Sequence, residues 1–182
     1  MIAISPNGYA FLKLKEGFRT QAYPDGGGVW TIGYGSTRWE DGSSIKPGQT
    51  IDEPRAFNLL KTKADGFLSQ VAKYILVPLN QNQVDAVAAF VYNIGVEAFE
   101  GSTFLTLLNK NDFAGALKQM VWQDEKGVYH GWIHVNGHVD NGLINRRHAE
   151  QALFNTPVTP NLTATAVVDF SNVQSGVTTF NG

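Results

Sequence analysis

The chain has 182 residues, a length that suits one compact domain of about 150 residues with a short appendage. Lysine and arginine number 14 against 16 aspartates and glutamates, which gives a formal net charge of −2 at pH 7 with no basic segment. This balance argues against a nucleic-acid binder, because such proteins gain affinity from clustered positive charge. The sequence contains no cysteine, which excludes a disulfide scaffold and a thiol nucleophile.

Hydropathy predicts no membrane insertion. No window approaches the roughly 18 apolar residues of a spanning helix, and the first residues lack the basic start and apolar run of a secretion signal. We therefore expect a product that begins in the cytoplasm and needs another factor to act outside it.

The first element is a predicted helix. Ser5 followed by proline indicates its start, and the Glu-Gly pair at Glu16 indicates its end. Phe11, Leu14 and Phe18 recur at helical spacing along this segment. From residue 23 to 48, glycine-rich turns separate short apolar runs, which predicts a small antiparallel sheet.

Asp52 is expected to cap the longest helix of the chain. The apolar positions of this helix hold a spacing of three to four and are Phe57, Leu60, Ala64, Phe67, Val71 and Tyr74. Asn80 and Gln83 resemble a capping box for the next helix. Its expected buried stripe consists of Val84, Val87, Ala88 and Val91. Shorter helices are predicted near 103–109, 113–121 and 143–154.

Residues 123–141 break the helical pattern and predict an inserted β-ribbon that turns at Asn136 and Gly137. Residues 155–182 begin as a linker and then alternate apolar and polar residues, which is the period of a strand. We expect this tail to dock or pair with another element.

Three histidines recur every four residues at His130, His134 and His138, the spacing of a metal-ligand stripe on a helix. The glycines and Asn136 among them argue against a helix. In a ribbon that turns after Val135, His138 pairs with that valine and lies on the other face from His130 and His134. We therefore expect no metal site, and a ribbon that is solvated or contacts substrate.

Two carboxylic acids and a hydroxyl form the candidate chemistry. Glu16, Asp25 and Thr31 lie on a helix end, a glycine turn and a strand, so they can converge on one point. The helix dipole and partial burial disfavour an ionised Glu16, whereas the polar glycine turn favours an ionised Asp25. Two carboxyl groups in such unlike environments are typical of enzymes that cleave glycosidic bonds.

The strand that contains Thr31 is expected to have one bare face. Alternation along residues 29–35 places bulky side chains on one face and Thr31, Gly33 and Gly35 on the other. A strip without side chains beside a hydroxyl would let a sugar chain approach the backbone. We therefore predict that Gly33 and Gly35 bind substrate.

Residues 16–35, EGFRTQAYPDGGGVWTIGYG, contain the order Glu16-x8-Asp25-x5-Thr31 and resemble the phage-type lysozymes, the endolysins of glycoside hydrolase family 24. The similarity continues in the same order through residues 83–95, 101–103 and 142–150, and it covers about residues 5–154.

The resemblance implies an α+β, lysozyme-like fold for a catalytic domain over 1–154. It implies a small β-containing lobe at about 20–51, a long connecting helix, and a helical lobe at about 75–154. Bacterial peptidoglycan would bind between the lobes without a metal or cofactor. The implied activity is hydrolysis of the β-1,4 bond from N-acetylmuramic acid to N-acetylglucosamine.

The family roles transfer to matching positions of this sequence. Glu16 matches the general acid, Asp25 the carboxylate that activates water or stabilises the cation, and Thr31 the hydroxyl that positions the water. The family reaction is regarded as inverting, which requires carboxyl groups roughly 6.5–9.5 Å apart. Arg146 matches an arginine that approaches the glutamate and favours its ionised form, against burial and the helix dipole.

Asn93 matches a polar residue of the cleft, and a loop-capping amide is an equal alternative. Ser102 belongs to a further shared motif and is assigned to substrate binding.

The long ribbon at 123–141 and the tail at 155–182 depart from the family pattern. Trp122, Tyr129 and Trp132 either pack the ribbon or offer rings for sugar stacking. We expect a monomer that is released to the wall through a holin-made lesion or is carried in a virion. A lytic transglycosylase and a non-enzymatic wall-binding module are the alternative functions.

Overall fold

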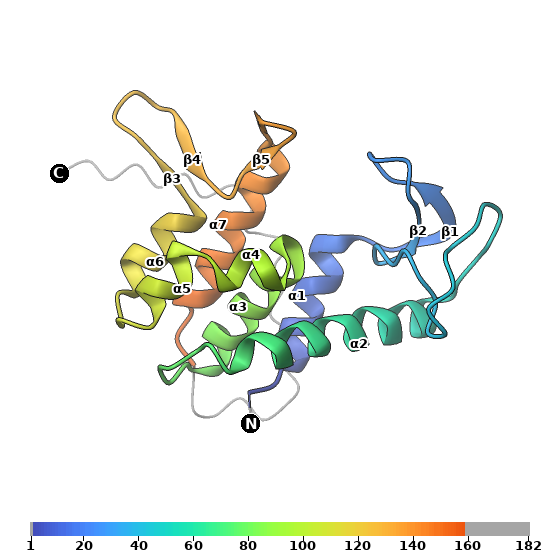
Figure 1. Cartoon of the computed structure of the whole chain (residues 1–182), viewed down its shortest axis with the longest axis horizontal. Coiled ribbons are helices and arrows are strands. Elements are labelled where there is room, and N and C mark those ends of the chain that lie inside the picture. Colours follow the sequence, from blue (N-terminus) through green and yellow to red (C-terminus); the bar gives the residue numbers. More distant parts are fainter. Residues whose placement is uncertain (1, 159–182) are drawn as a thin grey trace.

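The computed structural model describes residues 2–158, which form a helical body with a small β-hairpin beside it (Figure 1). The helices are α1 (Pro6–Glu16), α2 (Glu53–Ala72), α3 (Gln81–Ile94), α4 (Val96–Glu100), α5 (Thr103–Leu108), α6 (Phe113–Met120) and α7 (Asn141–Asn155). The strands are β1 (Arg19–Pro24), β2 (Trp30–Gly33), β3 (Val121–Gln123), β4 (Tyr129–Gly131), β5 (His134–Val135) and β6 (His138–Val139). The strand predicted in the tail lies outside the described residues.

Helix α1 begins and ends where the sequence predicts. The Ser5 side chain caps it, and Glu16 is its last residue. The predicted apolar face was wrong in part, because Leu14 is 54% exposed and Phe18 lies beyond the helix end. The helix packs against α3 through a face that includes Phe11, and this contact decides which side chains are buried.

Helix α3 is the centre of the helical body. Every residue from 84 to 92 is buried, including the four of the predicted stripe. A single buried stripe was therefore too narrow a prediction, because α1, α2, α4 and α7 all pack against this helix. The predicted capping box of Asn80 and Gln83 is confirmed, as is the Asp52 cap of the 20-residue helix α2. The short helix α4 had no counterpart in the sequence prediction.

The predicted antiparallel sheet is a two-stranded hairpin of β1 and β2. Tyr23 pairs with Thr31, and Arg19 pairs with Gly33. Four residues of β1 thus span two of β2, and the extra residues at 20–22 hydrogen-bond to the segment 49–51 that leads into α2. This bulge attaches the hairpin to the long helix.

The bare strand face predicted over 29–35 does not exist. Strand β2 ends at Gly33, and Ile32 and Ser36 exchange two backbone hydrogen bonds of 2.9 Å that close a turn over residues 33–35. Thr31 is only 4% exposed, and Gly33 is buried against helix α2. Tertiary packing thus covers a face that alternation alone left open.

The predicted ribbon is confirmed as two short antiparallel hairpins, β3–β4 and β5–β6, between α6 and α7. The second turns at Asn136 and Gly137, whose φ angles of 50° and 80° are those of a two-residue hairpin turn. Val135 pairs with His138, as the sequence predicts. Within residues 2–158, no helix is both long and apolar enough to cross a membrane.

Candidate active site

Glu16 is the last residue of α1, and its side chain is 17% exposed. Its Oε1 accepts a hydrogen bond of 2.8 Å from Nη2 of Arg146 on α7. Gly17 then ends the helix with φ 68°, a left-handed conformation that suits glycine. The carboxyl group therefore lies where the chain leaves the helical body for the β-hairpin.

The second oxygen of Glu16 faces the turn after β2. A methyl group added at Gly35 would lie 3.7 Å from Oε2, so the carboxyl group approaches the backbone of this turn. Gly35 has φ 83°, which also favours glycine there. Glu16 thus lies between α7 of the helical body and the turn that follows β2.

Arg146 is a cation shared by two carboxylates. Besides Glu16, its Nε donates to Oε1 of Glu150, one turn further along α7, at 3.1 Å. Burial alone lowers the pKa of Arg146, but the charges and hydrogen bonds of Glu16 and Glu150 outweigh it and leave the pKa raised. Arg146 therefore remains charged beside Glu16.

Asp25 and Thr31 are linked through one residue of the hairpin turn. Oδ1 of the exposed Asp25 accepts from the backbone N–H groups of Gly27 and Val29, both at 2.9 Å. The Thr31 hydroxyl donates to the Val29 carbonyl oxygen at 3.0 Å. The hairpin turn thus fixes the carboxylate and the hydroxyl relative to each other.

The candidate catalytic residues therefore form two groups, Glu16 at the end of α1 and Asp25 with Thr31 on the β1–β2 hairpin. Glu16 lies against the turn after β2, and Asp25 lies at the turn between β1 and β2. Thr31 and Gly33 are two residues apart on β2, which is roughly 7 Å along a strand.

Two of the predicted substrate-binding residues have structural contacts. A methyl group at Gly33 would lie 2.8 Å from Cβ of Ala56, so this glycine allows β2 to pack on α2. Ser102 is 5% exposed, and its hydroxyl accepts from the Leu105 N–H at 3.1 Å and donates to the Phe99 carbonyl at 2.7 Å. These contacts give no support to substrate binding by either residue.

Asn93 is exposed at the end of α3, and its side-chain oxygen accepts a hydrogen bond from Arg147 of α7. It therefore contacts the arginine that follows Arg146, the partner of Glu16. Arg147 and Glu150 were not singled out from the sequence. The available signal was their spacing from Arg146, because residues three and four apart share one helix face.

The aromatic residues of the ribbon mostly pack against neighbours. The Trp122 ring stacks on His130, with centroids 4.5 Å apart, and the Lys118 ammonium lies 4.5 Å from the same ring. Tyr129 meets His148 edge to face. Trp132 is 36% exposed and meets Phe90 edge to face.

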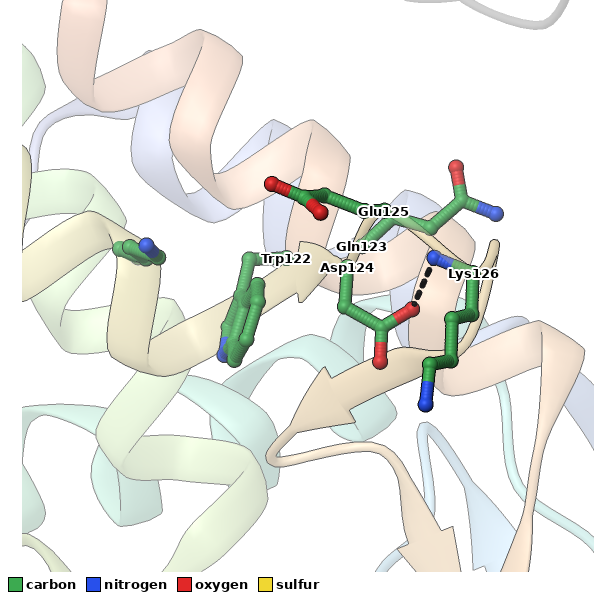
Figure 2. A pocket seen from close by; sticks show the side chains of 6 residues that line it. Trp122, Gln123, Asp124, Glu125 and Lys126 are labelled. Carbon is green, nitrogen blue, oxygen red and sulfur yellow. Dashed lines mark hydrogen bonds between the residues drawn. The ribbon is translucent and has the colours of Figure 1, made fainter.

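An open pocket of about 540 Å³ lies on the β3–β4 hairpin (Figure 2). It is lined by Lys118 and residues 122–126, and none of the predicted catalytic residues contributes to it. His130 is paired with Asp124 at 3.0 Å. Across residues 2–158, no three His, Asp or Glu side chains lie together in a group suited to a metal ion.

A helical body with a small N-terminal hairpin and a glutamate between them defines a lysozyme-like hydrolase. The family model described as "Phage lysozyme" matches residues 13–150, and the chain belongs to this family. It is therefore a glycoside hydrolase, an endolysin that degrades peptidoglycan.

Individual relatives agree with this assignment. The endolysin of Salmonella phage P22 is 39% identical over 155 residues, which cover 85% of this chain and 99% of the relative. The structure of an endolysin from Escherichia coli O157:H7 phage FAHEc1 superposes with a TM-score of 0.72 at 32% identity, over 87% of this chain and 97% of that one. The muramidase domain of SpmX from Asticaccaulis excentricus gives 0.69 at 31% identity, over 86% and 100%.

Proposed function

We propose that this endolysin is a muramidase, which hydrolyses the β-1,4 bond from N-acetylmuramic acid to N-acetylglucosamine with Glu16 as general acid. The observation that carries the proposal is the position of Glu16 between Arg146 and Gly35. One carboxyl oxygen is anchored by a cation, and the other faces Gly35, which has no side chain. The similarity to a solved muramidase domain supports the same substrate.

Glu16 protonates the leaving glycosidic oxygen in this mechanism. Oε2, the oxygen that faces Gly35, is the one placed to carry the proton. A proton delivered by a positioned side chain accelerates such reactions by about 10²–10⁴-fold. Arg146 then stabilises the carboxylate that remains after the transfer.

Asp25, with Thr31, directs the attacking water to the opposite face of the sugar. Asp25 is exposed, and backbone hydrogen bonds hold only its Oδ1. The second oxygen is therefore available to accept a proton from water. Thr31 is anchored to the same turn through Val29, which fixes its hydroxyl relative to Asp25.

Substrate contacts are assigned to three of the predicted residues around this site. Gly35 allows a sugar to approach Glu16, and Arg146 and Asn93 present polar groups from α7 and α3. The enzyme acts as a monomer and reaches the wall through a holin-made lesion or from a virion. Lysis of intact host cells by the enzyme alone, with no permeabilising agent, would contradict this route.

The test compares Glu16→Gln with the wild type on outer-membrane-permeabilised cells. We expect the rate of turbidity loss to fall by at least about 10²-fold while the melting temperature stays close to that of the wild type. Glu97→Gln on α4 changes an exposed glutamate and serves as the control. Full activity of Glu16→Gln would disprove the assignment of the acid.

Mass spectrometry of digested peptidoglycan identifies the reaction. Hydrolysis yields fragments with new reducing ends, whereas a lytic transglycosylase yields products lighter by one water. We expect reducing ends, and NMR of the first product should show an inverted anomer. Products lighter by one water would leave the glutamate as acid and remove the role of Asp25. Wall binding without fragments would favour the non-enzymatic module.

A further inference from the structure

We propose that Glu150 is a positioning residue that orients Arg146 and neutralises part of its charge beside Glu16. The inference rests on the proposed role of Glu16 as general acid. Glu150 lies on α7 and is fully buried. It would act on catalysis only through the arginine.

The guanidinium of Arg146 is held at two of its nitrogens. Nε donates to Glu150 and Nη2 donates to Glu16, at 3.1 Å and 2.8 Å. A planar group fixed at two adjacent donors cannot rotate about its long axis, so Glu150 determines where Nη2 points. Without Glu150, the guanidinium would keep its contacts with Glu16 and, at 3.5 Å, with the Ala89 carbonyl oxygen, but its Nε would lose the bond that orients it.

Glu150 also contacts a second arginine. Its Oε2 lies 3.1 Å from Nη1 of Arg147, and both side chains are fully buried. Arg147 lies over the Phe90 ring at 4.9 Å and donates to Asn93. Glu150 thus lies between two arginines, with a hydrogen bond to Arg146 and an ion-pair contact with Arg147.

Glu150 offsets part of the positive charge around Glu16. Arg146 contacts Glu16, Arg147 contacts Glu150, and Lys15 and Lys63 also interact with this cluster. If Glu150 were neutral, the net charge around Glu16 would become more positive by one, and such a charge favours the ionised carboxylate. A general acid must hold its proton, so this added positive charge would oppose catalysis.

Other charged or titratable groups also face this cluster. Lys63 of α2 and Tyr92 of α3 interact with Glu16, and Lys15 of α1 faces Arg146 and Glu150. Burial raises the pKa of Glu150, and the two arginines oppose this rise. Burial lowers the pKa of Arg147 to about 10, and the charge of Glu150 opposes this change. Among these groups, Glu150 is the carboxylate that contacts both arginines.

The test measures the pH dependence of kcat for three variants on permeabilised cells. In Glu150→Gln the amide oxygen still accepts from Arg146, but the negative charge is gone. We expect the alkaline limb of the profile to move to lower pH by about one unit or more, with KM changed little. Arg147→Gln removes a positive charge instead and should move the limb the opposite way.

The double variant Glu150→Gln with Arg147→Gln has the same net charge in this cluster as the wild type, and its profile should return toward that of the wild type. A folded Glu150→Gln enzyme with an unshifted profile would overturn the proposal. If this variant does not fold, an unshifted profile in Arg147→Gln would overturn it instead.

A merely structural role for Glu150 would lower the melting temperature without moving the profile. The control is Glu97→Gln, which should leave the profile in place. A different result would disprove the proposed function, namely full activity of the Glu16→Gln enzyme. An inactive Glu16→Gln combined with unshifted Glu150→Gln and Arg147→Gln profiles would remove only the positioning role.

Discussion

Arg146 donates a hydrogen bond of 2.8 Å to Glu16 from a position 130 residues later in the sequence. The bond joins the last residue of α1 to α7. Both of these helices pack against the central helix α3. Both partners are largely buried, with 10% and 17% of their side chains exposed. The proposed catalytic acid is therefore positioned by tertiary structure rather than by its local sequence.

Replacing Arg146 with lysine should reduce both stability and activity. A lysine keeps the positive charge but cannot bond Glu16 and Glu150 with the fixed geometry of a guanidinium. We expect the free energy of unfolding to fall by about 1–3 kcal/mol, as measured by urea denaturation, and kcat to fall with it. Arg38→Lys, at an exposed arginine, should change stability by less than about 0.5 kcal/mol. Equal effects of the two substitutions would contradict the role of Arg146.

Two substitutions of Asp25 distinguish the effect of its charge from the effect of its hydrogen bonds to the hairpin turn. Asparagine retains an oxygen that accepts from Gly27 and Val29, whereas alanine does not. We expect Asp25→Asn to lose at least about 10²-fold in kcat at a melting temperature near that of the wild type. Asp25→Ala should lose activity and also melt at a lower temperature. An active Asp25→Asn enzyme would remove the proposed role in directing water.

Local sequence signals predicted the helix starts because each cap needs only residues a few positions apart. Ser5, Asp52 and Asp112 each accept from a backbone N–H three residues later, which is visible as a polar residue before an apolar run. The Asn136-Gly137 turn was predictable for the same reason, since its geometry requires positive φ at both residues.

Tertiary contacts account for what the sequence did not reveal. Leu14 is exposed and all of residues 84–92 are buried because of which helices pack on α1 and α3. At the site, motif order pointed to Glu16 and Arg146, and the structure shows them in contact. Predicting the contact between Arg146 and Glu150 requires knowing that this face of α7 is turned inward, and periodicity alone does not show that.

Ser102→Ala distinguishes a helix cap from a substrate contact. The hydroxyl caps α5 through the Leu105 N–H, and a lost serine cap costs about 1 kcal/mol. We expect that loss in urea denaturation, with kcat and KM unchanged at a temperature where the protein is folded. Ser69→Ala, at an exposed position within α2, is the control and should have little effect. A raised KM in Ser102→Ala would restore the substrate-binding assignment.

Alanine substitutions at two glycines separate backbone strain from packing. Gly33 and Gly42 have φ angles of 64° and 83°, so a side chain at either costs about 1–2 kcal/mol. At Gly33 the new methyl group would also lie 2.8 Å from Cβ of Ala56, whereas nothing lies within 4 Å at Gly42. Overpacking typically adds about 1–3 kcal/mol, so Gly33→Ala should be the less stable protein in urea. Equal losses would show that β2 does not pack closely on α2.

The Asp124–His130 pair should make part of the stability of the β3–β4 hairpin depend on pH. The pKa of Asp124 is lowered, chiefly because the His130 ring hydrogen-bonds to the carboxylate. The unfolded chain then binds more protons than the folded one between the lowered pKa and the ordinary value of about 3.9, so stability rises with pH through this window. The contribution is complete above the window and is lost as pH falls through it.

Asp124→Asn keeps an oxygen that can accept from the Lys126 and Val128 N–H groups but loses the charge. Its melting temperature should therefore lie below that of the wild type at pH 5, and the difference should shrink as pH falls below about 3.9. Glu125→Gln removes a negative charge from the same turn and is the control. A difference for Asp124→Asn that stays constant from pH 5 to pH 2 would show that the carboxylate is not stabilised by His130, and that the pair holds the hairpin by hydrogen bonding alone.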